Sequence, residues 1–146
     1  VQYLDGLSAH GGSDLTAAAR SFAIKHPGKG IVVVISDFMD KRGYEDALRY
    51  LLARNMDIYV VHVLSQEEVE PEITGDLRLI DCEDEDMAEI TVSAPLLKRY
   101  KETLDSYVGG FREWCTRRGI SYIFTTNQAP FDKLILNYLR ERGLVK

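Results

Sequence analysis

The chain has 146 residues and a formal net charge of −5 at pH 7, with 45% hydrophobic and 28% charged residues. This length suits one domain with a single sizeable core, and the composition is typical of a globular protein. The negative charge argues against broad binding to a phosphate backbone, which needs a basic surface, so nucleic acid is not an expected partner.

The two cysteines, Cys82 and Cys115, have no CxxC spacing and no histidine cluster around them. They suit a reducing compartment, and the sequence predicts no zinc site. No apolar run approaches the roughly 18 residues of a membrane helix, and no signal peptide is recognisable. The chain begins at Val1 without a methionine, and we expect it to be a piece of a longer protein.

A helix and a strand come first in chain order. Ser13 or Asp14 is expected to cap a helix whose apolar residues recur at three- and four-residue spacing, and Pro27 and Gly28 end it. The run 31–35, IVVVI, is apolar on both faces. This pattern is typical of an interior strand in a parallel sheet.

A second helix and strand follow. The segment 43–55, GYEDALRYLLARN, has helical spacing with Asn55 as its C-terminal stop, and 57–64, DIYVVHVL, is the next strand. Residues 31–64 therefore predict a βαβ unit with parallel strands and a right-handed crossover.

The segment 75–93 alternates apolar and polar residues and predicts a small inserted β-hairpin with an acidic tip at 81–86. The tip lacks the central glycine and distal glutamate of an EF-hand, so a solvated turn is the expected role. A long helix follows, ended by Gly119. Gly109 and Gly110 weaken its middle by about 1 kcal/mol each relative to alanine, and they would be tolerated if the helix packs closely there.

The last two elements are a strand at 120–126, ISYIFTT, and a helix that begins near Pro130. Helices and strands thus alternate along the chain, apart from the hairpin. The sequence predicts one α/β domain over 1–146 with a doubly wound, mostly parallel sheet and the inserted hairpin at 75–93.

Candidate chemistry gathers after the first strand. Ser36, Asp37 and Asp40 lie at its carboxyl end, where open parallel sheets bind ligands. Asp37 either serves a site, as a cation ligand or a base, or forms a turn or a cap for the helix that starts near Tyr44. The sequence leaves both interpretations open.

The segment 11–16, GGSDLT, is the second candidate. Two glycines before a helix let backbone N–H groups approach an anion or a metal-bound group, whereas the plainer interpretation is a flexible loop with a Ser or Asp cap. His62 lies in an apolar strand and is expected to be a core histidine. No serine or cysteine has the surroundings of a catalytic nucleophile.

Three stretches resemble a known family: GGSDLTAAAR at 11–20, VVVISDFMDKRGYEDALRYLLARNMDIYVVHVL at 32–64, and GDLRLIDCEDEDMAEITVSAPLLKRYKETL at 75–104 with CTRRGISY at 115–122. They are similar to the C-terminal half of a von Willebrand factor A-like domain, of the bacterial domain-of-unknown-function family number 58. The resemblance implies that 1–146 is a partial domain of Rossmann-like type whose first strands are missing.

The wider fold is known for a metal-ion-dependent adhesion site, MIDAS. There a DxSxS loop, a Thr or Ser in a second loop and an Asp after the fourth strand surround a divalent cation. By position, Ser13 matches the second-loop hydroxyl and Asp37 the strand-four carboxylate, with Ser36, Asp14 and Asp40 as supporting residues around them. Such oxygen ligands suit Mg²⁺ or Mn²⁺, and an open coordination position then accepts a carboxylate of a partner.

This chain departs from that pattern at three points. Ser13 replaces the commoner Thr, Phe38 follows Asp37 where Gly is usual, and no DxSxS occurs. Two oxygen ligands imply that this chain binds Mg²⁺ or Mn²⁺ weakly or not at all, even if the full-length protein has a complete site.

The resemblance implies a non-enzymatic protein-interaction module. It also implies genes beside MoxR-type AAA+ ATPases, a role in metal-dependent assembly or maturation, and a place on the cytoplasmic face, with N-terminal membrane helices in many relatives. The alternative from another class is a Mg²⁺-dependent phosphotransfer or hydrolase domain using Asp37 and Asp40. In this fold the strand at 31–36 normally pairs with the first strand, which is missing here. We therefore expect this chain to form a homodimer through that edge.

Overall fold

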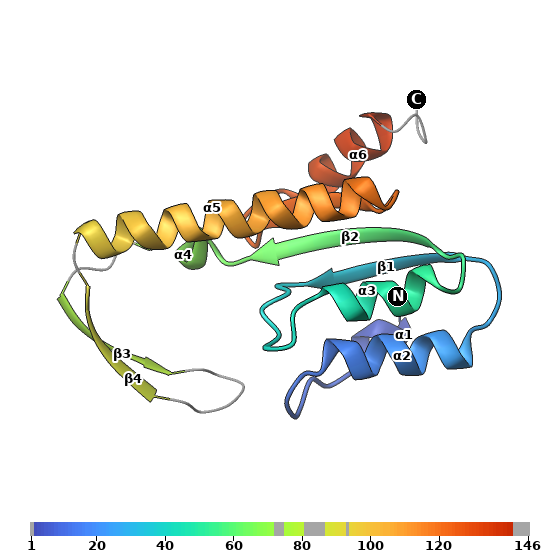
Figure 1. The fold of residues 1–146 in the computed structure, drawn as a ribbon, viewed down its shortest axis with the longest axis horizontal. Helices are drawn as coiled ribbons and strands as arrows, with labels where there is room; N and C mark the ends of the chain where they lie inside the picture. Colours follow the sequence, from blue (N-terminus) through green and yellow to red (C-terminus); the bar gives the residue numbers. More distant parts are fainter. Residues whose placement is uncertain (1, 72–74, 81–86, 93, 142–146) are drawn as a thin grey trace.

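Helices and strands alternate along most of the chain (Figure 1). The computed structural model describes residues 2–71, 75–80, 87–92 and 94–141. The helices in this part of the chain are α1 (Gln2–Asp5), α2 (Leu15–Lys25), α3 (Glu45–Leu52), α4 (Gln66–Val69), α5 (Ala94–Arg117) and α6 (Phe131–Glu141). The strands are β1 (Ile31–Ser36), β2 (Asp57–Leu64), β3 (Gly75–Ile80), β4 (Met87–Val92) and β5 (Ser121–Thr126). None of these helices is both long enough and apolar enough to cross a membrane.

Three of the described strands form an open parallel sheet in the order β1-β2-β5. Val34 of β1 lies opposite Val60 of β2, and Val60 in turn lies opposite Tyr122 of β5. The prediction of a mixed α/β fold with a parallel sheet is confirmed.

One face of the sheet carries the main core. The Tyr44 ring, at the start of α3, stacks on Phe111 of α5 with centroids 3.7 Å apart, which places both helices over this face. Since burying an apolar side chain stabilises a fold by about 1.5–3 kcal/mol, this cluster holds the helices on the sheet. Its buried members include Ala47, Leu48, Leu51, Ile58, Val60, Phe111, Cys115 and Ile120.

The other face is covered by α6 on one side and open on the other. Tyr138 of α6 contacts Tyr59 of β2 edge-to-face, with ring centroids 6.5 Å apart. At the far side of the sheet, the β1 side chains of Ile31, Val33 and Ile35 are 70%, 55% and 64% exposed. These three residues form an uncovered apolar stripe.

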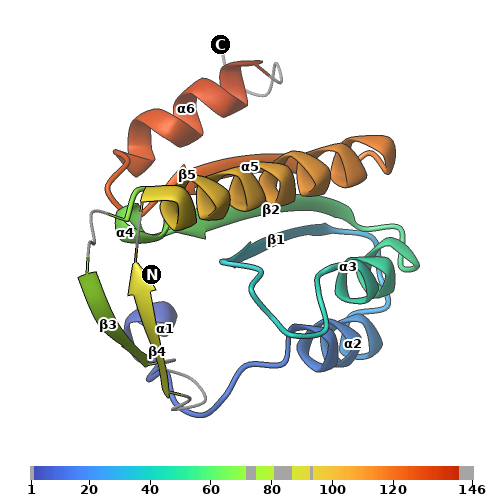
Figure 2. The ribbon, with the colours of Figure 1, turned by 60° about the vertical axis from the view of Figure 1, so that its left-hand side comes forward.

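The run 31–35 is apolar on both faces, as in an interior strand, and the absence of its usual neighbour was expected to leave it as an edge in this chain; among the described strands that expectation is confirmed. β1 pairs only with β2 and lies at the edge of the sheet (Figure 2). The sequence pattern indicates that both faces of the strand are apolar. It gives no information on how many neighbouring strands pair with β1.

The short helix α4 was not expected. Its start has a capping box: the Ser65 hydroxyl accepts from the Glu68 N–H, and the Glu68 carboxylate accepts from the Ser65 N–H at 2.7 Å. The S-x-x-E spacing at 65–68 was the sequence signal for it. β3 and β4 then pair antiparallel before α5, where the alternating pattern placed a hairpin. The acidic segment 81–86, which includes Cys82, lies outside the described residues.

Close packing does not account for the two glycines in α5. A Cβ built on Gly109 or Gly110 meets nothing within 4 Å, so no close packing requires a glycine there. Gly119 and Asn55, in contrast, have φ of 70° and 53°, which is the left-handed conformation expected just after a helix.

Candidate functional site

The loop after β1 contains the two candidate carboxylates and an unusual backbone conformation. Phe38 has a φ of 55°, which is uncommon for a bulky residue. Its N–H donates to the Ser36 hydroxyl at 3.0 Å. Asp37 is exposed, and its carboxylate accepts from the Met39 N–H at 3.0 Å. The Asp37 side chain therefore shapes a tight turn and does not cap α3, whose N-cap residue is Tyr44 and whose start has no side-chain cap hydrogen bond.

The strained position at Phe38 is held from both sides. The Tyr107 hydroxyl of α5 donates to the Phe38 carbonyl at 2.6 Å, and burial raises the pKa of Tyr107 to about 12, so this donor keeps its proton. The Phe38 ring is 1% exposed and lies edge-on to Phe111 at 4.8 Å. Such a backbone conformation costs on the order of 1–3 kcal/mol and persists only where its surroundings fix it.

Asp40 ties this loop to the start of α2. One carboxylate oxygen accepts from the Leu15 N–H at 2.9 Å, and the other accepts from the Arg42 N–H at 2.8 Å. The hydrogen bond from Arg42, then that from Leu15, lowers the pKa of Asp40 below its usual value, against a smaller opposing effect of burial. Asp40 is thus a cap for a helix 25 residues away in sequence.

Asp14 completes the junction. It is the N-cap of α2, and its carboxylate accepts from the Ala17 N–H at 2.8 Å. Its second oxygen lies 3.2 Å from Arg42 in an ion pair whose side chains are 40% and 68% exposed. An exposed pair of this kind contributes at most about 1 kcal/mol, so the backbone bonds made by Asp40 and Asp14 are the main attachments.

These contacts bring the two predicted segments together at the carboxyl end of β1. Ser13 directly precedes the N-cap of α2, Asp37 lies in the loop that Asp40 attaches to that helix, and both are exposed. Hydroxyl and carboxylate oxygens are the donors that Mg²⁺ and Mn²⁺ prefer. The described residues contain no group of three His, Cys, Asp or Glu side chains suited to a metal ion. The two predicted donors, Ser13 and Asp37, are of the class that suits these cations.

His62 lies on β2 beside this loop and is fully buried. Its Nδ1 lies 2.7 Å from the Tyr122 hydroxyl, and its Nε2 has no hydrogen-bond partner. Burial lowers the pKa of His62, and the backbone and charge of Asp37, with the charge of Glu68, oppose this shift less strongly. The imidazole is consequently neutral near pH 7, as expected for a core histidine.

Two contributors to the loop were not identified from the sequence. Tyr107 belongs to α5, and no local pattern places its hydroxyl on the Phe38 carbonyl 69 residues earlier. The left-handed Phe38 had a weak signal, because it occupies the position where the resembled pattern usually has Gly, the residue that adopts this conformation most readily.

The sequence model of the family described as "Protein of unknown function DUF58" matches residues 4–106. The chain belongs to the DUF58 family. The match contains Ser13, Asp14, Ser36, Asp37 and Asp40, whereas β5 and α6 lie beyond it. No curated protein and no solved structure matches this DUF58 chain.

Proposed function

We propose that this DUF58 chain is a non-enzymatic protein-interaction module of von Willebrand factor A type. It recognises partner proteins at the carboxyl end of β1, where Ser13 and Asp37 contribute to a site for a divalent cation, Mg²⁺ or Mn²⁺. The observation that carries the proposal is the pair of Asp40 hydrogen bonds, 2.9 Å to Leu15 and 2.8 Å to Arg42. The bond to Leu15 joins the two segments that contain the candidate ligands, the bond to Arg42 lies within the second segment, and both ligands are exposed.

The available donors fit a shared site better than a self-sufficient one. A hydrated Mg²⁺ needs six oxygen ligands in near-octahedral geometry, and Ser13 and Asp37 supply two of them. Further protein ligands must come from outside this pair. The partner's carboxylate is the expected final ligand, so the cation would join the two proteins without chemistry at the metal.

The enzymatic alternative relies on Asp37 together with Asp40. Both Asp40 oxygens already accept backbone N–H groups, and these bonds lower its pKa, which weakens it as a proton acceptor. A residue so engaged suits positioning better than acid–base work. This argument favours the interaction module.

Calorimetric titration of this chain with Mg²⁺ and Mn²⁺ tests the shared site. We expect no micromolar binding, because two ligands leave most of the coordination to water. Micromolar binding that disappears in Asp37→Ala would show that the site is complete within this chain. Turnover of a generic phosphate ester that needs both Mg²⁺ and Asp37 would instead establish the enzymatic alternative.

The proposed partner is a MoxR-type AAA+ ATPase, and binding is tested with a purified ATPase of this type from the same organism. We expect Mg²⁺-dependent binding of the full-length protein that Asp37→Ala weakens at least about ten-fold, equivalent to about 1.4 kcal/mol. Asp105→Ala, an exposed aspartate on α5, is the matched control and should bind normally. Equal binding by the Asp37 variant and wild type, or binding insensitive to chelation of Mg²⁺, would contradict the proposed site.

A further inference from the structure

His62 is a buried polar side chain that the proposed site leaves unexplained. It is fully buried in β2, and its Nε2 has no hydrogen-bond partner. Buried polar atoms nearly always have a partner, because an unpaired one loses its bonds to water and gains none in return. An orphaned ring nitrogen beside a candidate site therefore needs a reason.

The imidazole of His62 packs against the loop that contains Asp37. Ser36, the last residue of β1, lies opposite His62 in the sheet, so the chain that continues into Asp37 starts beside the imidazole. The Phe38 ring then meets the imidazole edge-on, with ring centroids 5.5 Å apart. The orphaned nitrogen thus belongs to a ring that supports this loop from β2.

The hydrogen of the neutral imidazole lies on Nε2. The Tyr122 hydroxyl is 2.7 Å from Nδ1, and in the described part of the chain it has no other hydrogen-bond partner. Burial raises the pKa of Tyr122, so the hydroxyl keeps its hydrogen and donates it to an unprotonated Nδ1. The other tautomer would leave both the hydroxyl hydrogen and Nε2 unpaired. Nε2 is therefore an N–H donor.

The main-chain carbonyl of Asp37 is the acceptor nearest to this donor's need. Burial lowers the pKa of His62, and the largest opposing influence is the backbone of Asp37. A backbone group favours a protonated ring through its carbonyl, since an N–H would have the opposite effect. The Asp37 carbonyl thus lies near the ring, although Nε2 makes no hydrogen bond in this structure.

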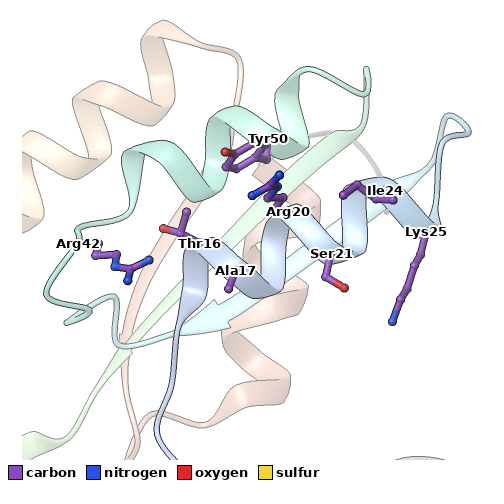
Figure 3. A pocket seen from close by; sticks show the side chains of 8 residues that line it. All are labelled: Thr16, Ala17, Arg20, Ser21, Ile24, Lys25, Arg42 and Tyr50. Atoms are coloured by element: carbon purple, nitrogen blue, oxygen red, sulfur yellow. The ribbon is translucent and has the colours of Figure 1, made fainter.

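The loop is already attached on its other sides. From α5, the Tyr107 hydroxyl donates to the Phe38 carbonyl at 2.6 Å. On the side of α2, Arg42 extends to the start of the helix (Figure 3), where it pairs with Asp14 at 3.2 Å. The bond from β2 through His62 is unmade, so this side of the loop has a donor in reserve.

We infer that His62 is a positioning residue of the proposed cation site: when the Asp37 carboxylate binds Mg²⁺ or Mn²⁺, the Asp37 carbonyl accepts the Nε2–H of His62. The inference rests on that site. In this structure the carboxylate is turned toward the Met39 N–H at 3.0 Å, and turning it toward a cation moves the peptide to which it is attached. Because the new bond satisfies the buried donor only in the loaded state, it favours that state. The imidazole stays neutral and does not touch the cation.

Nitrogen NMR of this chain with isotope-labelled histidine tests the tautomer, and His62→Asn identifies the His62 signals. Without a cation, we expect a protonated Nε2 and an unprotonated Nδ1. In Tyr122→Phe, which has no hydroxyl to donate, the proton should be shared between the two nitrogens. A protonated Nδ1 in wild type would overturn the inference, because Nε2 would then have no hydrogen to donate.

The same measurement on the full-length protein, with and without saturating Mg²⁺, tests the hydrogen bond. We expect Mg²⁺ to move the Nε2–H proton signal of His62 downfield. A scalar coupling between Nε2 and the carbonyl carbon of Asp37 should appear at the same time, and it reports the bond directly. An Nε2–H signal that Mg²⁺ leaves unchanged would overturn the inference.

Two substitutions separate the Nε2 donor from the rest of the imidazole. His62→Gln keeps an N–H donor near the position of Nε2, whereas His62→Asn keeps one only near Nδ1. In the full-length protein, His62→Asn should weaken Mg²⁺ binding at least about ten-fold, or about 1.4 kcal/mol. His62→Gln should retain most of the affinity. Equal losses in the two variants would contradict the role of Nε2.

Phe124→Leu is the matched control for damage to the core, because the apolar Phe124 ring packs on the imidazole with centroids 5.3 Å apart. It should lower the free energy of unfolding and leave Mg²⁺ affinity unchanged. A loss of affinity as large as that of His62→Asn would reduce the role of His62 to packing.

Asp37→Ala distinguishes a failure of this inference from a failure of the proposed function. If Asp37→Ala abolishes Mg²⁺ binding and His62→Asn does not weaken it, the cation site stands and the inference about His62 is wrong. If the full-length wild type binds no Mg²⁺, both are wrong.

Discussion

At the residue scale, the Asp40 carboxylate connects α2 to the loop after β1 by accepting from the Leu15 N–H, while Tyr107 fixes the same loop from α5. The loop is short and contains a left-handed Phe38, so its shape depends on these attachments from distant parts of the chain. These attachments hold the loop in the conformation in which Asp37 is exposed. The candidate ligand and the residues that place it are therefore separable by mutation.

Asp40→Asn removes one of the two carboxylate acceptors. One backbone N–H, at Leu15 or Arg42, then loses its partner, and we expect a loss of about 1–2 kcal/mol in the free energy of unfolding, as for the removal of a helix cap. Urea unfolding at pH 7, where the Asp40 carboxylate is fully ionised, measures it. Asp105→Asn is the control, since this exposed aspartate makes no hydrogen bond or ion pair within the described part of the chain, and it should change stability by less than about 0.5 kcal/mol. Similar values for the two variants would show that the Asp40 bonds do not hold the loop.

His62 makes stability depend on pH. Burial lowers its pKa in the folded protein below the usual value of 6.5, so between these two pKa values the unfolded chain binds more protons than the folded one. Stability must then fall as the pH drops below about 6.5, by at most about 1.4 kcal/mol per pH unit for one proton. Urea unfolding at about pH 7, 6 and 5 measures this slope, because these values run from above the usual histidine pKa to below it.

The comparison variant is His62→Asn, which has no group that titrates in this range and should show a smaller loss of stability between these pH values. His10→Asn, at an exposed histidine outside the helices, should keep the wild-type slope. If His62→Asn and wild type have the same slope, the imidazole of His62 does not take part in the pH dependence.

At the scale of elements, α5 contains residues that local preference alone does not explain. Gly109 and Gly110 lie in the middle of a 24-residue helix with open space at each Cβ position. Gly119, just after the helix, has a φ of 70°. Glycine is therefore dispensable at the first two positions and needed at the third.

Gly110→Ala is expected to stabilise the protein by about 0.5–1 kcal/mol, because alanine restricts the unfolded chain and meets no neighbour in the folded one. Gly119→Ala is expected to destabilise it by about 1 kcal/mol, since a Cβ is strained in the left-handed conformation. Urea unfolding of both variants checks the pair of opposite signs. Destabilisation by Gly110→Ala would indicate that something covers this face of α5.

The elements themselves were largely predictable, because hydrophobic spacing reports secondary structure directly. The segment 57–64 is the observed β2, and Asp14, one of two expected caps, is the N-cap of α2. The contacts that shape the site were not predictable. The Asp40–Leu15 bond spans 25 residues and the Tyr107–Phe38 bond spans 69, and each depends on how helices pack. The local sequence pattern contains no information about contacts between residues that are so far apart along the chain.

At the scale of the whole molecule, the sheet is covered unevenly. Helices α3 and α5 cover one face through the aromatic cluster of Tyr44 and Phe111, whereas the opposite face is left open at β1. The β1 edge has no proline and no charged residue, IVVVIS, which are the usual devices against edge-to-edge pairing. This combination predicts association through β1.

We propose that a second copy of this chain pairs with β1, which would join two three-stranded sheets into one of six strands. In sedimentation experiments at micromolar concentration, we expect a dimer for wild type. Val33→Lys, a charge in the middle of the apolar stripe, should shift the protein toward monomer. Tyr3→Lys places the same charge on α1, at a side chain that is 79% exposed, and should remain dimeric.

Hydrogen exchange identifies the surface involved. Only one edge of β1 pairs with β2, so the β1 N–H groups that point away from β2 should exchange slowly in the dimer and quickly in Val33→Lys. A monomeric wild type contradicts the pairing. A dimer that persists in Val33→Lys, with β1 amides still exchanging quickly, would place the contact elsewhere, and the uncovered stripe of Ile31, Val33 and Ile35 would then lie outside the interface.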